Sequence, residues 1–583
     1  MVLQRRLISN LPILLLIVLL FVYIVYPLGA MLSESLSLPV SAYRAKAMGW
    51  DPDKQPFAAP LRRVFSEPNA MSALSGTLKI ALSTVIAGGA WGLGLALLWS
   101  RREFPGRRFF AAFGYAPVLM PPLVGTLAFY RLIGDGGMLW HWIPLNGGRP
   151  WLGGFGQVLL MHVYSFGIYT YAYTAAALED TDFSREDAAR SLGAGALKTF
   201  FAAVWPLVLP AVLASALLTF MGAAASFSAP YILDNPSHYL TVEIVNNRDD
   251  LGLQRALGAL LACVSLAALP GFLYFSRQGR RGSAGAAEIG ADVTMGLKGA
   301  AARRLPQASP AGAALRIVLS LAALAVLLAP PAMVVFSALF SPAPGQASTG
   351  IAGIRAALNE ENLGALQRSG LYGAAAAGID VVLALAIALA LRRASFAPAM
   401  LIEFAVMLAV AIPGSVVALS ILSAFNGPTP LAFGVPLGGT AAILIYAYAL
   451  RCLPLAVRPA RAALEAVGGD LENAAASLGA GRARIFWRVV LPLILPSLLA
   501  AALICFITGM GEFVASELLY YPWTKPVSVQ IAELFRTAPA PAFVLALCLM
   551  ILSAAAVAGR FLAIDFGNRI ARWMTHISMR RPP

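Results

Sequence analysis

Residues 186 to 210 read EDAARSLGAGALKTFFAAVWPLVLP, and residues 472 to 496 read ENAAASLGAGRARIFWRVVLPLILP. The two stretches carry the same pattern at a constant offset of 286 residues, and the register continues upstream, where AALE occurs at both 176–179 and 462–465. Chance does not explain agreement over this length. The chain therefore contains two copies of one unit, each with a polar stretch and a glycine hinge leading into an apolar helix rich in Leu and Pro.

The composition indicates a membrane protein. Of the 583 residues, 59% are hydrophobic and only 12% are charged, whereas about a quarter of an ordinary soluble domain is charged. A run of about 20 apolar residues spans the hydrocarbon layer as a helix, and helices satisfy their own backbone hydrogen bonds in lipid. The predicted fold class is all-α, a polytopic membrane protein.

The formal net charge of +15 does not indicate a nucleic-acid partner. The basic residues lie in short clusters between apolar runs, which is the pattern of the positive-inside rule rather than of one basic face. The expected partner of the long apolar surface is the lipid bilayer.

The apolar runs predict about twelve spans, six in each half. If the N-terminus is cytoplasmic, both termini and both copies of the repeated stretch are cytoplasmic, and Pro121 and Pro413 kink the equivalent third spans. The predicted spans are 9–31, 72–99, 109–132, 156–178, 204–229 and 255–275, followed by 313–340, 370–391, 398–425, 438–457, 490–516 and 541–562.

Three regions follow from this count. Residues 1–276 form a first transmembrane domain with its loop at about 184–210, and residues 313–583 form a second with its loop at about 470–496. Residues 277–312 between them are rich in Gly, Ala and Arg and predict a cytoplasmic linker. Because each half has an even number of spans, the halves form a parallel repeat, with a transport pathway expected between them.

The repeated loop predicts a short helix and a sharp turn in each copy. Ser184 and Asp470 are residue types that cap helix N-termini, and an acidic residue follows in the first turn, where the helix dipole favours negative charge. Gly193 and Gly479 suit a helix end in the left-handed conformation. We expect a helix, a bend and a second helix that enters the membrane.

These residues resemble the EAA loop of binding-protein-dependent ABC importer permeases, although Asp187 and Asn473 stand where that pattern has its first Ala. The resemblance implies that each loop couples the permease to an ATP-binding subunit, with small Ala side chains for close approach and Glu offered to a basic residue of the partner. The implied coupling residues are Glu186, Ala188, Ala189, Gly193 and Pro206 in the first copy, and Glu472, Ala474, Ala475, Gly479 and Pro492 in the second.

The chain has no phosphate-binding loop of its own. The segment from Gly193 to Thr199 has Leu197 where GxxxxGK[ST] requires glycine. We therefore expect no enzyme activity and no cofactor in this chain, with ATP bound by partner subunits. The family resemblance implies two cytoplasmic ATP-binding subunits, an extracytoplasmic substrate-binding protein and a location in the bacterial inner membrane.

Ionisable groups inside apolar runs are candidates for the substrate pathway, because each costs roughly 2.5 to 3.5 kcal/mol at a helix centre on insertion scales. Asp380 is the deepest, as a pathway residue or a buried structural hydrogen-bonding group. Glu512 and its counterpart Ser226 lie where related segments approach the pathway. The ionisable groups concerned are Lys79, His162, Asp380, Glu403 and Glu512.

The remaining polar chemistry predicts no catalytic or metal site. The four cysteines, at 263, 452, 505 and 548, lie in or beside apolar runs without a CxxC pair, so we interpret them as small packing residues. Overall resemblance favours the ferric-iron importer group, with thiamine and aminoethylphosphonate importers as alternatives. A secondary transporter driven by an ion gradient and a non-transporting scaffold are the other classes considered.

Overall fold

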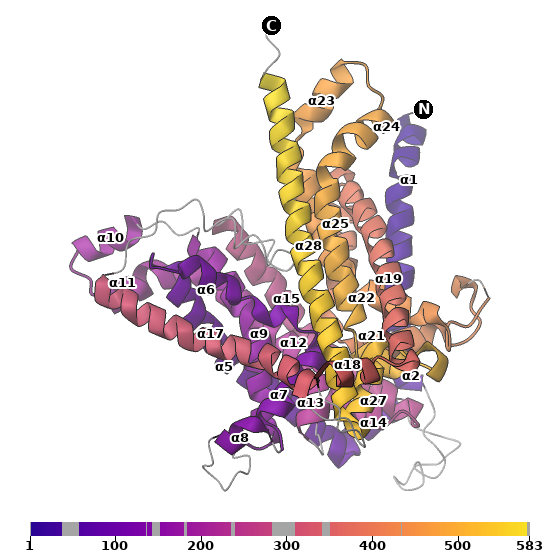
Figure 1. Ribbon diagram of the computed structural model, residues 1–583. Helices are drawn as coiled ribbons and strands as arrows, with labels where there is room; N and C mark the ends of the chain where they lie inside the picture. Colours follow the sequence, from indigo (N-terminus) through magenta and orange to yellow (C-terminus); the bar gives the residue numbers. More distant parts are fainter. Residues whose placement is uncertain are drawn as a thin grey trace.

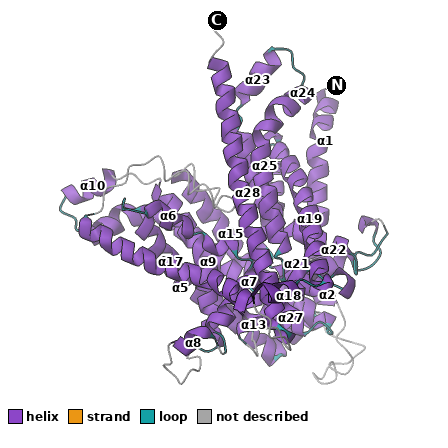
Figure 2. Ribbon diagram, in the orientation of Figure 1, coloured by secondary structure: helices purple, strands orange, loops and turns teal. Residues whose placement is uncertain are grey.

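The computed structural model describes residues 2–37, 58–135, 137–142, 152–179, 184–234, 239–282, 309–340, 350–432 and 434–579. This part of the chain is helical, without a strand element (Figure 2). The all-α prediction is thus confirmed. Most of the predicted 277–312 linker lies outside the described residues, and α15 (Leu251–Gly282) extends into its first positions.

Four long helices form the body of each half. The first half packs α5 (Pro68–Ser100), α9 (Gly154–Glu179), α12 (Trp205–Ala224) and α15 together. The second half packs α19 (Glu360–Arg393), α22 (Ala441–Ala466), α25 (Leu491–Met510) and α28 (Pro539–Met579). A helix of 26 residues, such as α9 or α22, is about 39 Å long at 1.5 Å per residue, which exceeds the roughly 30 Å hydrocarbon thickness.

Nine helices in the described part are long and apolar enough to cross a membrane, or ten if a bent pair counts as one span. That pair is α20 (Phe396–Ala411) and α21 (Gly414–Phe425), bent by 114° at the predicted proline, Pro413. The predicted span 109–132 is also broken at its proline, into α6 (Arg107–Phe113) and α7 (Pro122–Ile133). Proline lacks an N–H and clashes with the preceding turn, so both third spans are interrupted rather than gently kinked.

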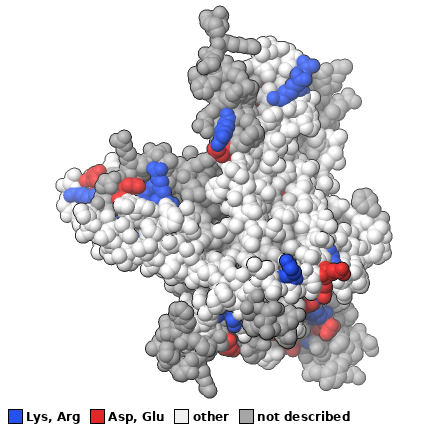
Figure 3. All heavy atoms as spheres, viewed as in Figure 1, with Lys and Arg blue, Asp and Glu red and all other residues white. Residues whose placement is uncertain are grey.

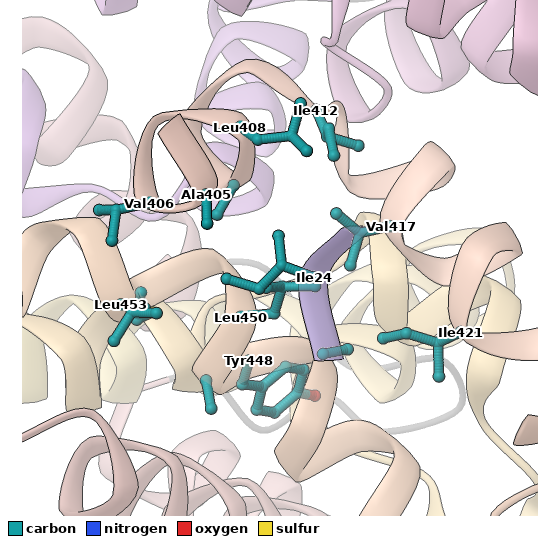
Figure 4. Close-up of a cluster of buried hydrophobic side chains, with 14 of the residues drawn as sticks. Ile24, Ala405, Val406, Leu408, Ile412, Val417, Ile421, Tyr448, Leu450 and Leu453 are labelled. Carbon is teal, nitrogen blue, oxygen red and sulfur yellow. The ribbon is translucent and has the colours of Figure 1, made fainter. Parts of the chain in front are cut away.

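The first helices of the two halves are exchanged. The N-terminal α1 (Val2–Leu20), its π-helical continuation Phe21–Val25 and α2 (Tyr26–Ser37) pack against α20 and α21 of the second half. Figure 4 shows Ile24 among Val417, Leu450 and other buried side chains of that half. Conversely, α17 (Pro310–Phe340) packs against α7 of the first half as well as against α28 of its own half. The sequence halves are therefore interlocked in space.

The two halves diverge at one end of the molecule and meet at the other. In Figure 1, the chain termini and α23 (Gly469–Ser477) lie at one end of the second half, whereas α10 (Ser184–Ser191) lies on the separate arm of the first half. The short helices α13 (Ser228–Leu233), α14 (Leu240–Asn246) and α27 (Val527–Thr537) gather at the opposite end. We call this opposite end the closed end.

Charged side chains on the face shown in Figure 3 lie mainly towards the ends of the molecule, and the broad surface of the long helices is almost free of them. Many large apolar side chains on those helices are exposed, including Ile86, Leu371 and Val382. Because a soluble monomer seldom exposes so much contiguous apolar surface, this distribution fits a chain surrounded by lipid.

Candidate functional site

The repeated stretch forms the same helix and turn in both copies. Helices α10 and α23, here called the loop helices, begin at Ser184 and Gly469. They end at Ser191 and Ser477, and the turns that follow contain Gly193 and Gly479, whose φ angles are +82° and +83°. In each copy the next residue donates its N–H five residues back at 3.1 Å, which satisfies an end carbonyl as in a Schellman turn. The predicted helix and glycine turn are confirmed in each copy, but the predicted cap at Asp470 is not, because Asp470 lies inside α23 and Gly468 is the N-cap residue.

The acidic residue of each loop helix is paired inside the chain. Glu186 is buried and accepts from Arg101 Nη2 at 2.6 Å, and Glu472 accepts from Arg392 Nη1 at 2.5 Å. Each of these arginines is the first of an Arg-Arg pair near the end of the second long helix, α5 or α19. Burial lowers the pKa of Arg101, and the Glu186 carboxylate opposes that shift. The Glu side chains thus fix the loop helices to their own half.

The outward faces of the loop helices carry alanines among charged and polar side chains, such as Asp187 and Arg190 of α10. Ala188 and Ala474 are exposed, and Ala189 and Ala475 are half-buried. Beyond each helix an equivalent leucine projects from the turn, and Leu192 and Leu478 are each 89% exposed. Each exposed leucine lies close to these alanines, on a loop helix that its Glu–Arg ion pair holds in place. Such a surface suits docking in an apolar cleft of a partner.

A π-helical turn links each loop to the following span. It covers Phe200–Val204 in the first copy and Phe486–Val490 in the second. Pro206 and Pro492 then stand at the starts of α12 and α25, where a missing N–H is tolerated. Each loop is consequently joined to a long helix that packs into the core of its half.

The halves meet through a pair of equivalent residues at the 286-residue offset. The rings of Phe227 and Phe513 lie 5.4 Å apart between centroids, and both are almost fully buried. Tyr231 stacks on Phe227 at 4.7 Å. Because equivalent residues of the two halves touch here, the pseudo-two-fold axis that relates the halves passes through this aromatic cluster beside α13.

Further contacts hold the halves together near the closed end. Arg536 lies 4.7 Å above the Tyr231 ring, and Arg248 lies 3.7 Å from Glu517. A Cβ added to Gly511 would lie 2.8 Å from Cβ of Pro121, so the backbone there approaches the break in the third span of the first half. These contacts bring α13 and α27 and the broken span into one junction.

The pathway candidates Ser226 and Glu512 lie directly before these aromatic residues. Ser226 Oγ lies 2.9 Å from His162 Nε2. Glu512 Oε2 lies 2.9 Å from Arg451 Nε, and its other oxygen accepts from the Ala515 N–H at 3.1 Å. The equivalent positions therefore carry a Ser–His contact in one half and an ion pair in the other.

Sequence reasoning missed Arg451. It lies within the predicted span 438–457 and aligns with Ser165 of the first copy. An arginine in one copy where the other has serine, inside an apolar run, is the sequence signal that could have identified it. Its side chain is 30% exposed. A Cβ on Gly414 would lie 2.1 Å from Arg451 Nη1, so the guanidinium packs against the start of α21.

The other singled-out groups have partners or surroundings of their own. His162 also contacts Thr84 at 3.3 Å, Glu403 pairs with Arg461 at 2.6 Å, and Lys79 is exposed on α5. Asp380 is fully buried, and its carboxylate lies beside the thiols of Cys452 and Cys505. Sequence spacing gave no sign of this cluster, because its members come from three helices.

Comparison with known proteins identifies the architecture. Residues 6–279 and 380–562 match the family described as binding-protein-dependent transport system inner membrane component. A probable ABC transporter permease of Sinorhizobium fredii is 28% identical over 74% of this chain and 76% of its own length. A ferric transport system permease of Actinobacillus pleuropneumoniae is 26% identical over 88% of this chain and 72% of its own. A molybdenum transport system permease of Haemophilus influenzae is 32% identical, over 27% of this chain and 69% of its own.

Proposed function

Because this chain belongs to the family of binding-protein-dependent transport system inner membrane components, we propose that it forms the translocation pathway of an ATP-driven importer of ferric iron. Both transmembrane domains are fused in one polypeptide. The observation that carries the proposal is the pair of loop helices, which have the same ends and the same internal ion pair in both copies.

The loop helices would each receive one ATP-binding subunit on the cytoplasmic side, where both termini also lie. Leu192 and Leu478 are the exposed apolar contacts of this docking surface. The internal ion pairs to Arg101 and Arg392 change the role expected for the Glu side chains. They would hold each loop helix rigidly, so that a movement of the partner subunit would also move the long helix that follows, α12 or α25.

In the proposed cycle, the state with the loop helices apart and Phe227 in contact with Phe513 would be the one that opens to the cytoplasm. ATP binding would draw the two loop helices together and part the aromatic junction, and hydrolysis would reset it. A substrate-binding protein would deliver the cargo at the closed end. The ATP-bound and free states would differ in affinity for the partners, as any ligand-driven change requires.

Ferric iron is favoured over other cargo by the extent of similarity. The ferric permease relative aligns over 88% of this chain at 26% identity, whereas the molybdenum permease, a shorter protein, aligns over 27% at 32% identity. Among the pathway residues, Ser226 and the Arg451–Glu512 ion pair would contact cargo. Asp380 remains a further pathway prediction.

The test is transport by the whole complex. The chain is co-expressed with its ATP-binding subunit, purified and placed in liposomes with its binding protein, and uptake of radioactive ferric iron is measured with ATP or with an ion gradient. ATP-dependent iron uptake is expected. Competition with thiamine, aminoethylphosphonate, molybdate and sulfate checks the cargo.

Four results separate the parts of the proposal. Uptake of another solute with ATP would overturn the cargo and keep the importer. Uptake that persists without any ATP-binding subunit would overturn the importer in favour of a secondary transporter. Purification without such a subunit would overturn the coupling role of the loop helices, and a bound subunit without any uptake would favour a scaffold.

A further inference from the structure

Three side chains from three helices of the second half converge in its interior. They are Asp380 of α19, Cys452 of α22 and Cys505 of α25, and their carboxylate oxygen and two sulfur atoms all lie within 4.8 Å of one another. Their exposed fractions are between 0% and 1%. Cys452 directly follows Arg451, the partner of Glu512, so the cluster lies next along α22 from that ion pair.

The carboxylate of Asp380 points into this cluster without compensation from a hydrogen bond. Within the described residues, neither of its oxygens has a hydrogen-bond partner. The two thiols each donate across to the backbone carbonyl of the other cysteine, at 3.6 and 3.5 Å. A buried polar group without a partner is costly, and an ion bound among these atoms would remove that cost.

The donor set matches a soft metal ion. Thiolates select ions such as zinc and cadmium, and zinc binds sulfur at about 2.3 Å and carboxylate oxygen at about 2.0 to 2.2 Å. In a tetrahedral site these bond lengths place the donor atoms about 3.5 to 3.8 Å apart, so the three side chains, whose atoms lie within 4.8 Å of one another, would move together by up to about 1 Å to close the site. Two thiolates and the Asp380 carboxylate carry three negative charges, so a divalent ion leaves the site with one, and the thiol protons leave when the ion binds.

We propose that Asp380, Cys452 and Cys505 bind one soft divalent metal ion of the zinc class, which ties α19 to α22 and α25. At the 286-residue offset, the first half has Phe166 and Thr219 in place of the two cysteines. The ion would therefore stiffen only the second half. It would be a resident ion rather than cargo, and the inference does not depend on which solute is transported.

The experiment uses the full-length chain in detergent under reducing conditions, with Co²⁺ as the probe. One equivalent should give thiolate charge-transfer and tetrahedral ligand-field absorption, and Zn²⁺ should displace it. Cys452→Ser and Cys505→Ser should abolish the signal. Asp380→Asn should raise the Kd on the order of tenfold or more, since loss of even an outer-shell partner costs 10- to 100-fold. The double variant Cys263→Ser and Cys548→Ser is the matched control and should keep the signal.

A second measurement on the wild-type chain needs no variant. Zn²⁺ should protect Cys452 and Cys505, but not Cys263 and Cys548, from alkylation in mildly denaturing detergent, read by peptide mass spectrometry. Three results would overturn the metal site. They are the absence of cobalt absorption at equimolar metal, a cobalt signal that survives loss of both cysteines, and a Cys452–Cys505 disulfide that persists in protein purified with reductant.

Discussion

The Arg101 guanidinium lies 2.6 Å from the Glu186 carboxylate and ties the first loop helix to the end of α5. The same relationship recurs between Arg392 and Glu472. The two pairs differ in environment, because the Glu186 side chain is 3% exposed and that of Glu472 is 30% exposed. Equivalent residues therefore have unequal energetic weight in the two halves.

This inequality predicts different costs for the same substitution. Glu186→Gln leaves a largely buried arginine unpaired, which should reduce the free energy of unfolding by about 1 to 3 kcal/mol. Glu472→Gln removes a more exposed pair, which should cost about 0 to 1 kcal/mol. Thermal unfolding of the detergent-solubilised complex and coupled ATPase activity measure both. Equal losses in the two variants would contradict the difference in burial.

The turns after the loop helices should depend on glycine for backbone reasons alone. A Cβ at Gly193 or Gly479 would meet no atom within 4 Å, but both residues have positive φ, which costs an L-residue roughly 1 to 2 kcal/mol. Gly193→Ala combined with Gly479→Ala should lower substrate-stimulated ATPase activity and transport together.

The matched control for the turns is Gly195→Ala with Gly481→Ala. These glycines also face open space but lack positive φ, so this variant should behave like the wild type. Loss of coupling in the control at the same level as in the Gly193 and Gly479 variant would show that flexibility of the whole loop, and not its left-handed turn, matters.

The aromatic junction should seal the pathway. Replacing Phe227 and Phe513 by Ala removes the contact between halves at 5.4 Å and opens space that water can enter. Proteoliposomes with this variant should show passive dye or ion leak in the absence of ATP. Phe109→Ala, at a 55% exposed position away from the junction, is the control, and leak of equal size there would refute the seal.

Close approach at the junction predicts sensitivity to a single methyl group. Gly511→Ala would place a Cβ 2.8 Å from Cβ of Pro121, whereas Gly509→Ala would meet its nearest atom at an ordinary 3.4 Å. The first substitution should shift the halves apart and lower the melting temperature and transport, and the second should change little. Similar melting temperatures for both variants would show that the junction relaxes freely.

The Arg451–Glu512 ion pair should be revealed by a double-mutant cycle. Arg451→Ala leaves the mostly buried Glu512 carboxylate unpaired, so it should reduce transport and stability more than the double change Arg451→Ala with Glu512→Gln. The coupling free energy comes from melting and from initial uptake rates. Additive effects would mean that the two groups do not act as a pair.

Local patterns in the sequence determined much of this protein. Hydropathy identified a helical membrane protein, the offset of 286 residues revealed the duplication, and the loop pattern located two helices and their glycine turns. These features depend on composition, on periodicity and on the conformational range of single residues, which act over a few positions of the chain.

The tertiary structure alone decided which distant residues meet. The exchange of α1 and α17 between halves, the capture of Glu186 by Arg101, the ion pair of Arg451 and the convergence of Asp380 with two cysteines all depend on which helices pack together. An apolar helix has a similar affinity for lipid and for many partners. Its neighbours are fixed by the fit of the whole bundle, which hydropathy and spacing along the chain do not encode.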